Sequence, residues 1–255
     1  MNKKRKFDKI CRDIKSVKIQ GARNIAREAL KAYHLIPTPV SKKILLSLRP
    51  TEPMLINVLN RLDKESYNKI LSHFEEAQDK INKKVLKLIN QNDIILTHCH
   101  STNVINSLIY AKKKGKHFEV YNTETRPLYQ GRKTAKQLKN AGIKVTIIPD
   151  SAVGIVLAGE QGMKKAKKVF LGSDALLKTG IINKIGSEVI AELAKKEKTP
   201  VYVIADSWKF TKTKIPLEQR NLNEVWNNAP KNIKIINPAF EFVKKKYITK
   251  IITDE

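Results

Sequence analysis

The hydrophobic pattern of the chain changes its period at Asp93. From residue 8 to residue 90 apolar residues recur at helical spacing, as in the amphipathic stretch from Lys64 to Asn90. From residue 93 onward, short β-rich runs alternate with helical stretches. Strands separated by helices favour right-handed βαβ units and a parallel sheet covered on both faces. We therefore predict an α/β fold, with a helical N-terminal domain (residues 1–90) followed by a Rossmann-like domain with a parallel sheet (residues 91–255).

The pattern also predicts where the elements of the second domain lie. No G-x-G-x-x-G motif follows the first predicted strand, so a dinucleotide cofactor is not indicated, and we expect no cofactor. Strands are expected at residues 94–96, 118–121, 145–148, 169–171, 201–204 and 233–236, and helices at 103–114, 134–140, near 153–157 and at 185–196.

The charge of the chain is unusually positive. Fifty basic residues against twenty-four acidic ones give a net charge of +26, which would suit a nucleic-acid partner. Only nine of the fifty are arginine, however, and aromatic residues make up only 6% of the chain. Proteins that bind nucleic acids favour arginine and aromatic side chains that stack on bases. We consider a nucleic-acid partner less probable than a small anionic one, which a positive field also attracts.

The composition describes a globular protein of the cytoplasm. No apolar run approaches the ~18 residues of a membrane span, so we expect no membrane association. The basic start of the chain is not followed by an apolar stretch, which argues against a secretory signal. The two cysteines, Cys11 and Cys99, lie far apart, and we expect both to be reduced.

Three predicted strands end in polar clusters. The clusters are Thr97–Ser101, Thr123–Arg132 and Gly172–Asp174. Ligands of open parallel sheets bind beyond the carboxyl ends of the strands. A thiol, a carboxylate and several cations are therefore expected to converge on one candidate active site.

Cys99 and Asp174 are the candidate catalytic residues. A thiol at a strand end can be activated by a neighbouring cation, although an isolated cysteine is often only a small buried apolar residue. Asp174 would act as a general acid or base if burial raised its pKa; the alternative is that it caps a following helix. His98 and His100 would point in opposite directions along a strand, and we expect no metal site.

Several residues are candidates for binding a phosphorylated substrate. Bidentate guanidinium groups and exposed backbone N–H groups suit phosphate. Asn183 and Lys184 are expected to open the next helix, where the helix N-terminus would add to the ammonium charge. The full set of predicted binding residues is Gly21, Ala22, Arg49, Arg126, Gly131, Arg132, Asn183, Lys184 and Lys209.

Five motifs, in order, resemble one superfamily. It unites the α, β and δ regulatory subunits of initiation factor two-B, the methylthioribose-1-phosphate isomerases and the archaeal ribose-1,5-bisphosphate isomerases. The matching segments are Ile94–Cys99, Thr123–Gly131, Gly172–Asp174, Gly180–Gly186 and Ser207–Phe210. One difference stands out: Gln20-Gly21-Ala22 replaces the usual Arg-Gly-Ala, so one guanidinium is missing.

The resemblance implies a function and leaves alternatives open. Both isomerase branches have a cysteine and an aspartate at the positions of Cys99 and Asp174, and the regulatory subunits typically lack them. The segment Ser207–Phe210, with Lys209, is similar to the bisphosphate enzyme and to the regulatory subunits, rather than to the methylthioribose-1-phosphate isomerases. The hypothesis is an isomerase that converts ribose-1,5-bisphosphate to ribulose-1,5-bisphosphate. The alternatives are a non-catalytic regulatory subunit that binds a nucleotide or sugar phosphate, and a methylthioribose-1-phosphate isomerase. The resemblance also implies homo-oligomers, as dimers or trimers of dimers, and makes AMP a possible activator.

Overall fold

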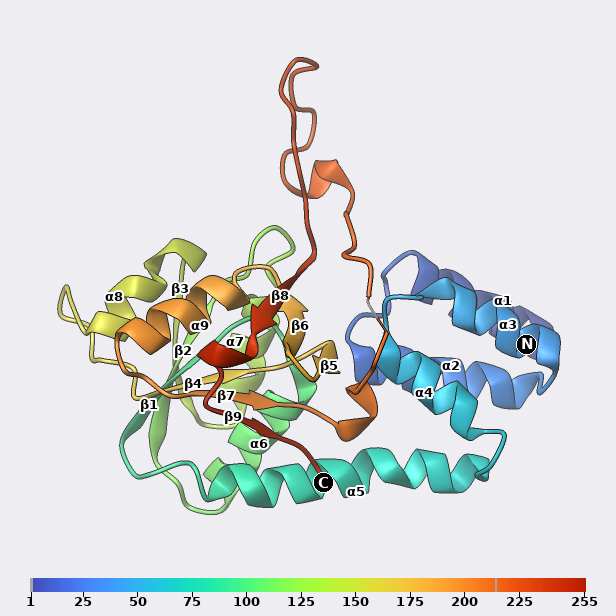
Figure 1. Cartoon of the computed structure of the whole chain (residues 1–255), viewed down its shortest axis with the longest axis horizontal. Helices are drawn as coiled ribbons and strands as arrows, with labels where there is room; N and C mark the ends of the chain where they lie inside the picture. Colours follow the sequence, from blue (N-terminus) through green and yellow to red (C-terminus); the bar gives the residue numbers. More distant parts are fainter. Residues whose placement is uncertain (1, 214) are drawn as a thin grey trace.

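The chain begins with five helices and continues with a mixed region of strands and helices. The structure, a computed structural model, describes residues 2–213 and 215–255. Figure 1 shows the helical region on one side and the sheet region on the other. The helices of the first region are α1 (Lys3–Lys15), α2 (Ala22–Leu35), α3 (Pro39–Leu48), α4 (Pro53–Arg61) and α5 (Tyr67–Leu86).

Local sequence signals explain where these helices begin. Gly21 precedes α2 with a φ of 85°, a backbone conformation that side chains with a Cβ rarely adopt. Thr38 caps α3, with its side-chain oxygen accepting the N–H of Ser41 at 3.1 Å. Proline at the start of α3 and α4 suits the first helical turn, where the missing N–H has no partner to lose.

The second region is built on a parallel sheet of six strands. The strand order is β3-β2-β1-β4-β7-β9, and all five neighbouring pairs are parallel. The order reverses between β1 and β4, which is the topological switch point of a doubly wound sheet. The predicted α/β class with a Rossmann-like parallel sheet is confirmed. The strands are β1 (Asp93–Thr97), β2 (Phe118–Thr123), β3 (Lys144–Ile148), β4 (Lys168–Leu171), β7 (Val201–Ile204) and β9 (Lys250–Ile252).

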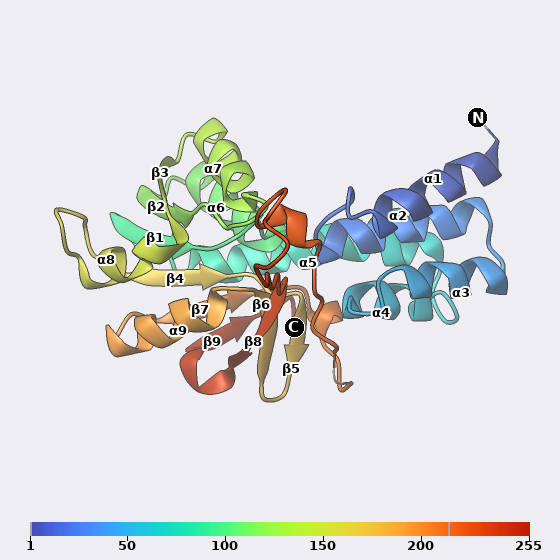
Figure 2. The ribbon, with the colours of Figure 1, turned by 90° about the horizontal axis from the view of Figure 1, so that it is seen from above.

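Helices cover both faces of this sheet (Figure 2). Alternate residues of β1 point to opposite faces, so Ile94 and Leu96 join one apolar cluster and Ile95 joins the other. The helices α8 (Val153–Ala158) and α9 (Ser187–Lys196) pack on the first cluster. The helices α6 (Thr102–Lys113) and α7 (Gln130–Asn140), with the end of α5, pack on the second.

The helix α5 joins the two regions. Ile70 and Phe74, near its start, pack in a cluster with α2, α4 and Trp208, whereas Ile81 and Val85 belong to the core under the sheet. Figure 1 shows this helix running below both regions. The change from helices to strands falls between Leu86 and Asp93. The division into domains at residue 90 stays a prediction, because α5 contributes to both cores.

A small second sheet was not predicted. The strands β5 (Ala175–Leu177), β6 (Gly180–Lys184) and β8 (Phe240–Lys244) form an antiparallel sheet in the order β5-β6-β8. The alternative in which Asp174 caps a helix is wrong, because Asp174 precedes a strand. The expectation that Asn183 and Lys184 open a helix is also wrong, because they end β6 and α9 begins three residues later, at Ser187. Residues 233–236 form no strand; the next one begins at Phe240.

An extended arm, residues 216–239, leaves the body of the molecule between β7 and β8. Figure 1 shows it rising from the junction of the two regions. It contains a short 3₁₀ turn, Leu222–Glu224, and an isolated antiparallel bridge between Gln219 and Pro238 that joins its two sides. Several of its large apolar side chains are exposed, among them Leu217, Trp226 and Ile236. No helix in the described residues combines the length and the hydropathy that a bilayer span requires.

Candidate active site

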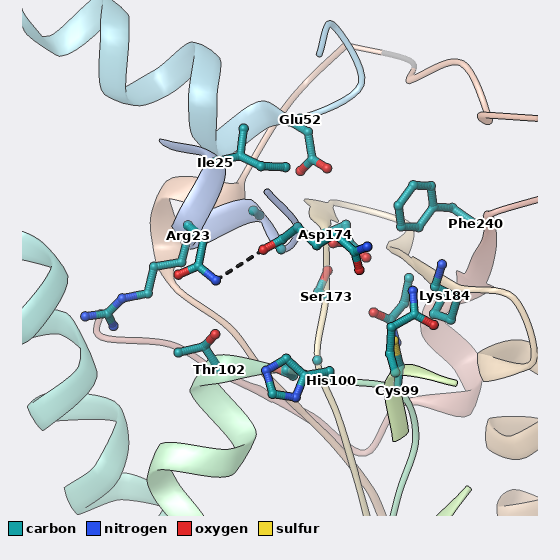
Figure 3. Close-up of a pocket in the computed structure, with 18 of the residues that line it drawn as sticks. Arg23, Ile25, Glu52, Cys99, His100, Thr102, Ser173, Asp174, Lys184 and Phe240 are labelled. Carbon is teal, nitrogen blue, oxygen red and sulfur yellow. Dashed lines mark hydrogen bonds between the residues drawn. The ribbon is translucent and has the colours of Figure 1, made fainter. Parts of the chain in front are cut away.

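A cavity of about 960 Å³, which includes space open to solvent, lies beyond the carboxyl ends of β1 and β4. This is the switch point of the sheet, where ligands of open α/β sheets bind. The helical region supplies the opposite wall through residues 20–25, Arg49 and Glu52 (Figure 3). Both predicted catalytic residues and most of the predicted binding residues line it: Cys99, Asp174, Gly21, Ala22, Arg49, Asn183, Lys184 and Lys209.

The backbone of Cys99 is held in an unusual conformation. Its φ is 66°, in the left-handed region that non-glycine residues rarely occupy. Its N–H donates to Thr125 Oγ1 at 3.0 Å, and its carbonyl accepts from Thr134 Oγ1 at 2.8 Å. Thr134 lies on α7 and Thr125 follows β2. Two neighbouring elements therefore fix Cys99 just beyond the carboxyl end of β1. Backbone strain held by such contacts is common at functional sites.

His98 supports this arrangement as a neutral imidazole. Its Nε2 lies 2.9 Å from the carbonyl oxygen of Ile185, which only accepts, so Nε2 carries the proton. Its Nδ1 therefore accepts from Thr123 Oγ1 at 2.6 Å, and Thr123 Oγ1 lies 3.2 Å from Thr125 Oγ1. Burial lowers the pKa of His98, which agrees with the neutral form. The chain of hydrogen bonds leads from Ile185 to the amide of Cys99.

Burial favours the neutral thiol of Cys99. It raises the pKa of Cys99 to about 11, and the ammonium of Lys184 acts in the opposite direction. The Nζ of Lys184 lies 4.9 Å from the centre of the Phe240 ring, which holds it beside the cavity. Lys184 is therefore the cation that favours the thiolate.

Asp174 follows β4 and faces the same cavity (Figure 3). Its backbone N–H donates to the carbonyl of Ile182 at 2.9 Å, which sets the start of the small sheet. Burial raises the pKa of its carboxyl, while Lys209, Lys184 and Arg49 lower it. The net shift is upward, as a general acid requires.

Lys209 lies beside Asp174 without being exposed. Its Nζ donates to the carbonyl of Ser173 at 2.7 Å, and burial lowers its pKa. Trp208, in the same 3₁₀ turn (Ser207–Lys209), packs between the helical region and the sheet region, because its ring stacks on His73 of α5 at 3.4 Å. This packing places the ammonium of Lys209 at the junction of the two regions.

Arg49 and Glu52 form the wall that the helical region contributes. Both are buried, at 7% and 2% exposure. Nη2 of Arg49 lies 2.8 Å from Glu218 Oε2, on the arm, and 3.4 Å from Glu52 Oε1. Burial and the charge of the neighbouring Asp174 together raise the pKa of Glu52 to about 8, although Arg49 and Lys209 act in the opposite direction.

Gly21 and Ala22 begin α2 at the edge of the cavity, and Gln20 lies there too. Arg23 also lines the cavity, but its guanidinium is engaged elsewhere. It donates to Glu75 Oε1 of α5 at 2.9 Å and to Gln78 Oε1 at 3.4 Å. Arg23 therefore does not supply the guanidinium that is missing at position 20.

Arg126, Gly131 and Arg132 are not among the described residues that line the cavity. Arg126 donates to the carbonyl of Val225 on the arm at 3.1 Å, and Arg132 donates to Glu124 at 3.1 Å. A Cβ on Gly131 would lie 1.8 Å from the carbonyl oxygen of Thr123. The glycine is thus required by the close approach of α7 to the end of β2.

Several lining residues were missed by the sequence-based prediction. Ser101, Thr102 and Asn103 lie at the N-terminus of α6, where Ser101 Oγ accepts the N–H of Val104 at 3.4 Å. The N-terminus of a twelve-residue helix attracts anions. The sequence did contain a signal for this helix start. Ser101 is the last residue of the polar cluster Thr97–Ser101, and a serine just before a helix is a typical helix cap. Glu52, also missed, gave no such signal.

The chain was compared with known proteins. The profile of the Initiation factor 2 subunit family matches residues 40–255. The ribose 1,5-bisphosphate isomerase of Methanocaldococcus jannaschii is 36% identical over 94% of this chain and 87% of that protein. The methylthioribose-1-phosphate isomerase of Petrotoga mobilis is 34% identical over 84% of this chain and 71% of that protein.

A solved structure shows the same fold. The translation initiation factor eIF-2B of Pyrococcus horikoshii superposes with a TM-score of 0.84 and 26% identity, over 97% of this chain and 94% of that one. The predicted resemblance is thereby confirmed. From the profile match and the similarity to these proteins, we conclude that the chain belongs to the Initiation factor 2 subunit family, which its five ordered motifs had indicated.

Proposed function

We propose that this protein is an aldose–ketose isomerase that converts ribose-1,5-bisphosphate to ribulose-1,5-bisphosphate. The observation that carries the proposal is that Cys99 and Asp174 line one cavity together with Arg49, Lys184 and Lys209. An acid, a base and several cations are the groups that isomerisation of a phosphorylated sugar needs. The similarity to proteins named as ribose 1,5-bisphosphate isomerases and as a methylthioribose-1-phosphate isomerase supports an enzyme of the isomerase class.

The first step would open the sugar ring. A phosphate on C1 locks the furanose, so the ring oxygen needs a proton before the bond to C1 breaks. Asp174 is placed to supply it, because its raised pKa favours the neutral acid. When the ketone forms, the proton on the C2 hydroxyl returns to the carboxylate of Asp174.

The second step would move one hydrogen. The thiolate of Cys99 takes the proton from C2, which leaves an enol between C1 and C2, and the thiol then returns that proton to C1. The electron pair of the broken C2–H bond forms the enol, and the ketone results when C1 is protonated. Lys184 favours the thiolate that this step needs. Each proton that leaves the substrate is thus matched by one that returns.

The cations would divide between the two ends of the substrate. Gly21, Ala22, Arg49 and the N-terminus of α6 would bind one phosphate, and Asn183, Lys184 and Lys209 would bind the other phosphate or the sugar hydroxyls. In this arrangement Arg126, Gly131 and Arg132 are assigned no contact with the substrate, because they do not line the cavity among the described residues.

The experiment is a turnover assay of the purified protein with ribose-1,5-bisphosphate, in which ribulose-1,5-bisphosphate is detected directly. Methylthioribose-1-phosphate serves as the competing substrate. Turnover of the bisphosphate alone supports the proposal. Turnover of methylthioribose-1-phosphate alone would instead make this protein a methylthioribose-1-phosphate isomerase. The 34% identity to the Petrotoga mobilis protein is the observation that supports this alternative.

A non-catalytic binding protein is the second candidate function. The high TM-score with translation initiation factor eIF-2B favours it, because the same cavity would hold a nucleotide or sugar phosphate without turnover. Tight binding of AMP or of a sugar phosphate with no product would support this candidate. If AMP instead raises the rate of isomerisation, it acts as an activator.

We also propose that the chain forms homo-oligomers, as dimers or trimers of dimers. The exposed apolar side chains of the arm, such as Trp226 at 49% and Ile236 at 68% exposure, support self-association. Light scattering should give the mass of two or of six chains, each of 29.0 kDa. A monomer at micromolar concentration would contradict the proposal.

A further inference from the structure

Three residues that line the cavity have a buried side-chain atom that lacks a hydrogen-bond partner among the described residues, 2–213 and 215–255: Nη1 of Arg49, Oε2 of Glu52 and Oε1 of Gln130. The first two lie together on the wall that the helical region contributes. Both residues line the cavity, and both are more than nine-tenths buried. A buried polar atom without a partner destabilises the folded protein, and a ligand that supplies the partner would remove that cost. The two atoms therefore mark a place where a polar group of the ligand belongs.

The charges around Glu52 decide which form of its carboxyl a ligand meets. Arg49 precedes it in the chain, Asp174 faces it from the loop after β4, Lys209 from the turn after β7, and Glu218 from the arm. Arg49 is shared with Glu218, whose Oε2 lies nearer to its Nη2 than Glu52 Oε1 does. Burial and Asp174 outweigh the two cations, and the pKa of Glu52 rises to about 8.

A neutral carboxyl changes the chemistry of this wall. In the carboxylate form, Oε2 would only accept, and it would repel a phosphate bound by Arg49. In the acid form it carries an O–H that donates. Nη1 of Arg49 always donates. The wall then offers two donors to one anion. Gln20 lines the same cavity, at the position where the Arg-Gly-Ala motif of the superfamily has its arginine.

We propose that Glu52, as a carboxylic acid, donates a hydrogen bond beside Arg49 to a phosphate group of the substrate, and so makes the affinity of this protein for phosphate depend on a proton. Glu52 is then a specificity-determining residue that replaces a lost cation with a neutral donor. The inference rests on the proposed function for the identity of the substrate. It does not depend on turnover, because inorganic anions probe the same wall.

The test measures the binding of inorganic sulfate and phosphate to the whole protein by calorimetry, from below pH 7 to above pH 9. Sulfate does not titrate in this range, so any pH dependence comes from the protein. We expect the sulfate Kd of the natural protein to rise by up to about tenfold per pH unit above the pKa of Glu52. Glu52→Gln, which keeps a neutral donor, should bind sulfate at low pH within about threefold of the natural protein, and its affinity should fall less with pH. Glu52→Ala should bind weakly throughout.

The control variant is Glu76→Gln, which makes the same substitution at an exposed position on α5; it should retain the natural pH dependence. Three results would overturn the inference. The first is that Glu52→Gln binds as weakly as Glu52→Ala at low pH, which would mean a structural ion pair with Arg49. The second is binding of phosphate with rejection of sulfate, which would mean a carboxylate that accepts the phosphate proton. The third is an identical pH dependence in Glu52→Gln and the natural protein.

A failure of the proposed function gives a different pattern. Loss of the isomerase assignment would appear as no turnover of ribose-1,5-bisphosphate, with the pH-dependent sulfate binding intact. If Glu52→Ala does not fold, the comparison of Glu52→Gln with the natural protein still decides the question.

Discussion

Nε2 of His98 lies 2.9 Å from the carbonyl oxygen of Ile185, and this hydrogen bond joins the end of β1 to the loop between β6 and α9. Ile185 directly follows Lys184, the last residue of β6, and Cys99 directly follows His98. The imidazole thus fixes the position of a thiol relative to the ammonium that favours its ionisation.

A change at His98 should therefore lower turnover through geometry. We expect His98→Ala to reduce kcat by on the order of 10²-fold, because small displacements of reacting groups have effects of this size. His98→Gln, whose amide N–H₂ can still donate to Ile185, should recover part of the rate. Steady-state kinetics with the bisphosphate would check this. Equal loss in both variants would argue against a positioning role for this hydrogen bond.

Removal of the Cys99 thiol should abolish turnover while binding persists. Cys99→Ser replaces the thiol by a much weaker acid, and we expect a loss of ~10²–10⁴-fold in kcat, as for removal of a general base. Cys11→Ser is the matched control, because Cys11 packs in the core of α1 and α2. Its kcat should be unchanged. Comparable losses in both variants would show that the effect is not specific to the site.

The charge state of Asp174 should set an alkaline limit of activity. Because burial raises its pKa, the acid is present at low pH and is lost as the pH rises through that pKa, so kcat/KM should fall on the alkaline side. Cys99 acts in the opposite direction, because its thiolate becomes more abundant with rising pH. Asp174→Asn should reduce kcat by ~10²–10⁴-fold. Its residual activity should lack the alkaline limit that Asp174 imposes, and an unchanged pH profile would argue against Asp174 as the acid.

Glu52 should also affect stability as a function of pH. Its pKa is about 8 in the folded protein, against an ordinary glutamate value of 4.5. Between these values the unfolded chain has lost a proton that the folded protein retains, so this residue lowers the free energy of unfolding as the pH rises through the window. Glu52→Gln should remove that slope. Urea denaturation at pH 5 and pH 8 would measure it, and an equal slope in both proteins would count against a buried neutral carboxyl.

Gly131 should matter for folding, whether or not it contacts a ligand. A Cβ there would lie 1.8 Å from the backbone of Thr123, so Gly131→Ala should lower the free energy of unfolding by about 1–3 kcal/mol or more. Gly154→Ala, in α8, is the control, because a Cβ at Gly154 meets nothing within 4 Å. It should stabilise the helix by roughly 0.5–1 kcal/mol. Thermal unfolding of both variants would separate a steric role from a role in binding.

The sequence predicted the sheet because the signals of a doubly wound fold are local. Apolar runs such as Ile94–Leu96 and Val169–Leu171 could be found without knowledge of their partners, and their ends located Cys99 and Asp174 correctly beside one cavity. The small antiparallel sheet was missed for two reasons. β5 has only three residues, so it gives little pattern, although its hairpin with β6 is local and pairs Leu177 with Gly180. β6 also pairs with β8, sixty residues further along, and no periodicity within Gly180–Lys184 records that partner.

The roles of the two arginines in the cluster Thr123–Arg132 could likewise not be judged from the sequence alone. Arg126 and Arg132 have the composition of an anion site, but their partners, Val225 on the arm and Glu124, are set by the fold. Conversely, Glu52 looks in the sequence like an ordinary surface residue between two prolines. Only its burial against Arg49 and its approach to Asp174 give it a role, and both depend on how the helices pack against the sheet.

The cavity is enclosed by three stretches of chain that are remote from one another in sequence. Arg49 comes from the helices, Asp174 from the sheet and Arg220 from the arm. The ion pair of 2.8 Å between Arg49 and Glu218 links the helices to the arm. A ligand that contacts all three stretches would hold them together. Saturation of the cavity with such a ligand should therefore protect the arm from proteases and raise the melting temperature of the whole chain, far from the cavity itself.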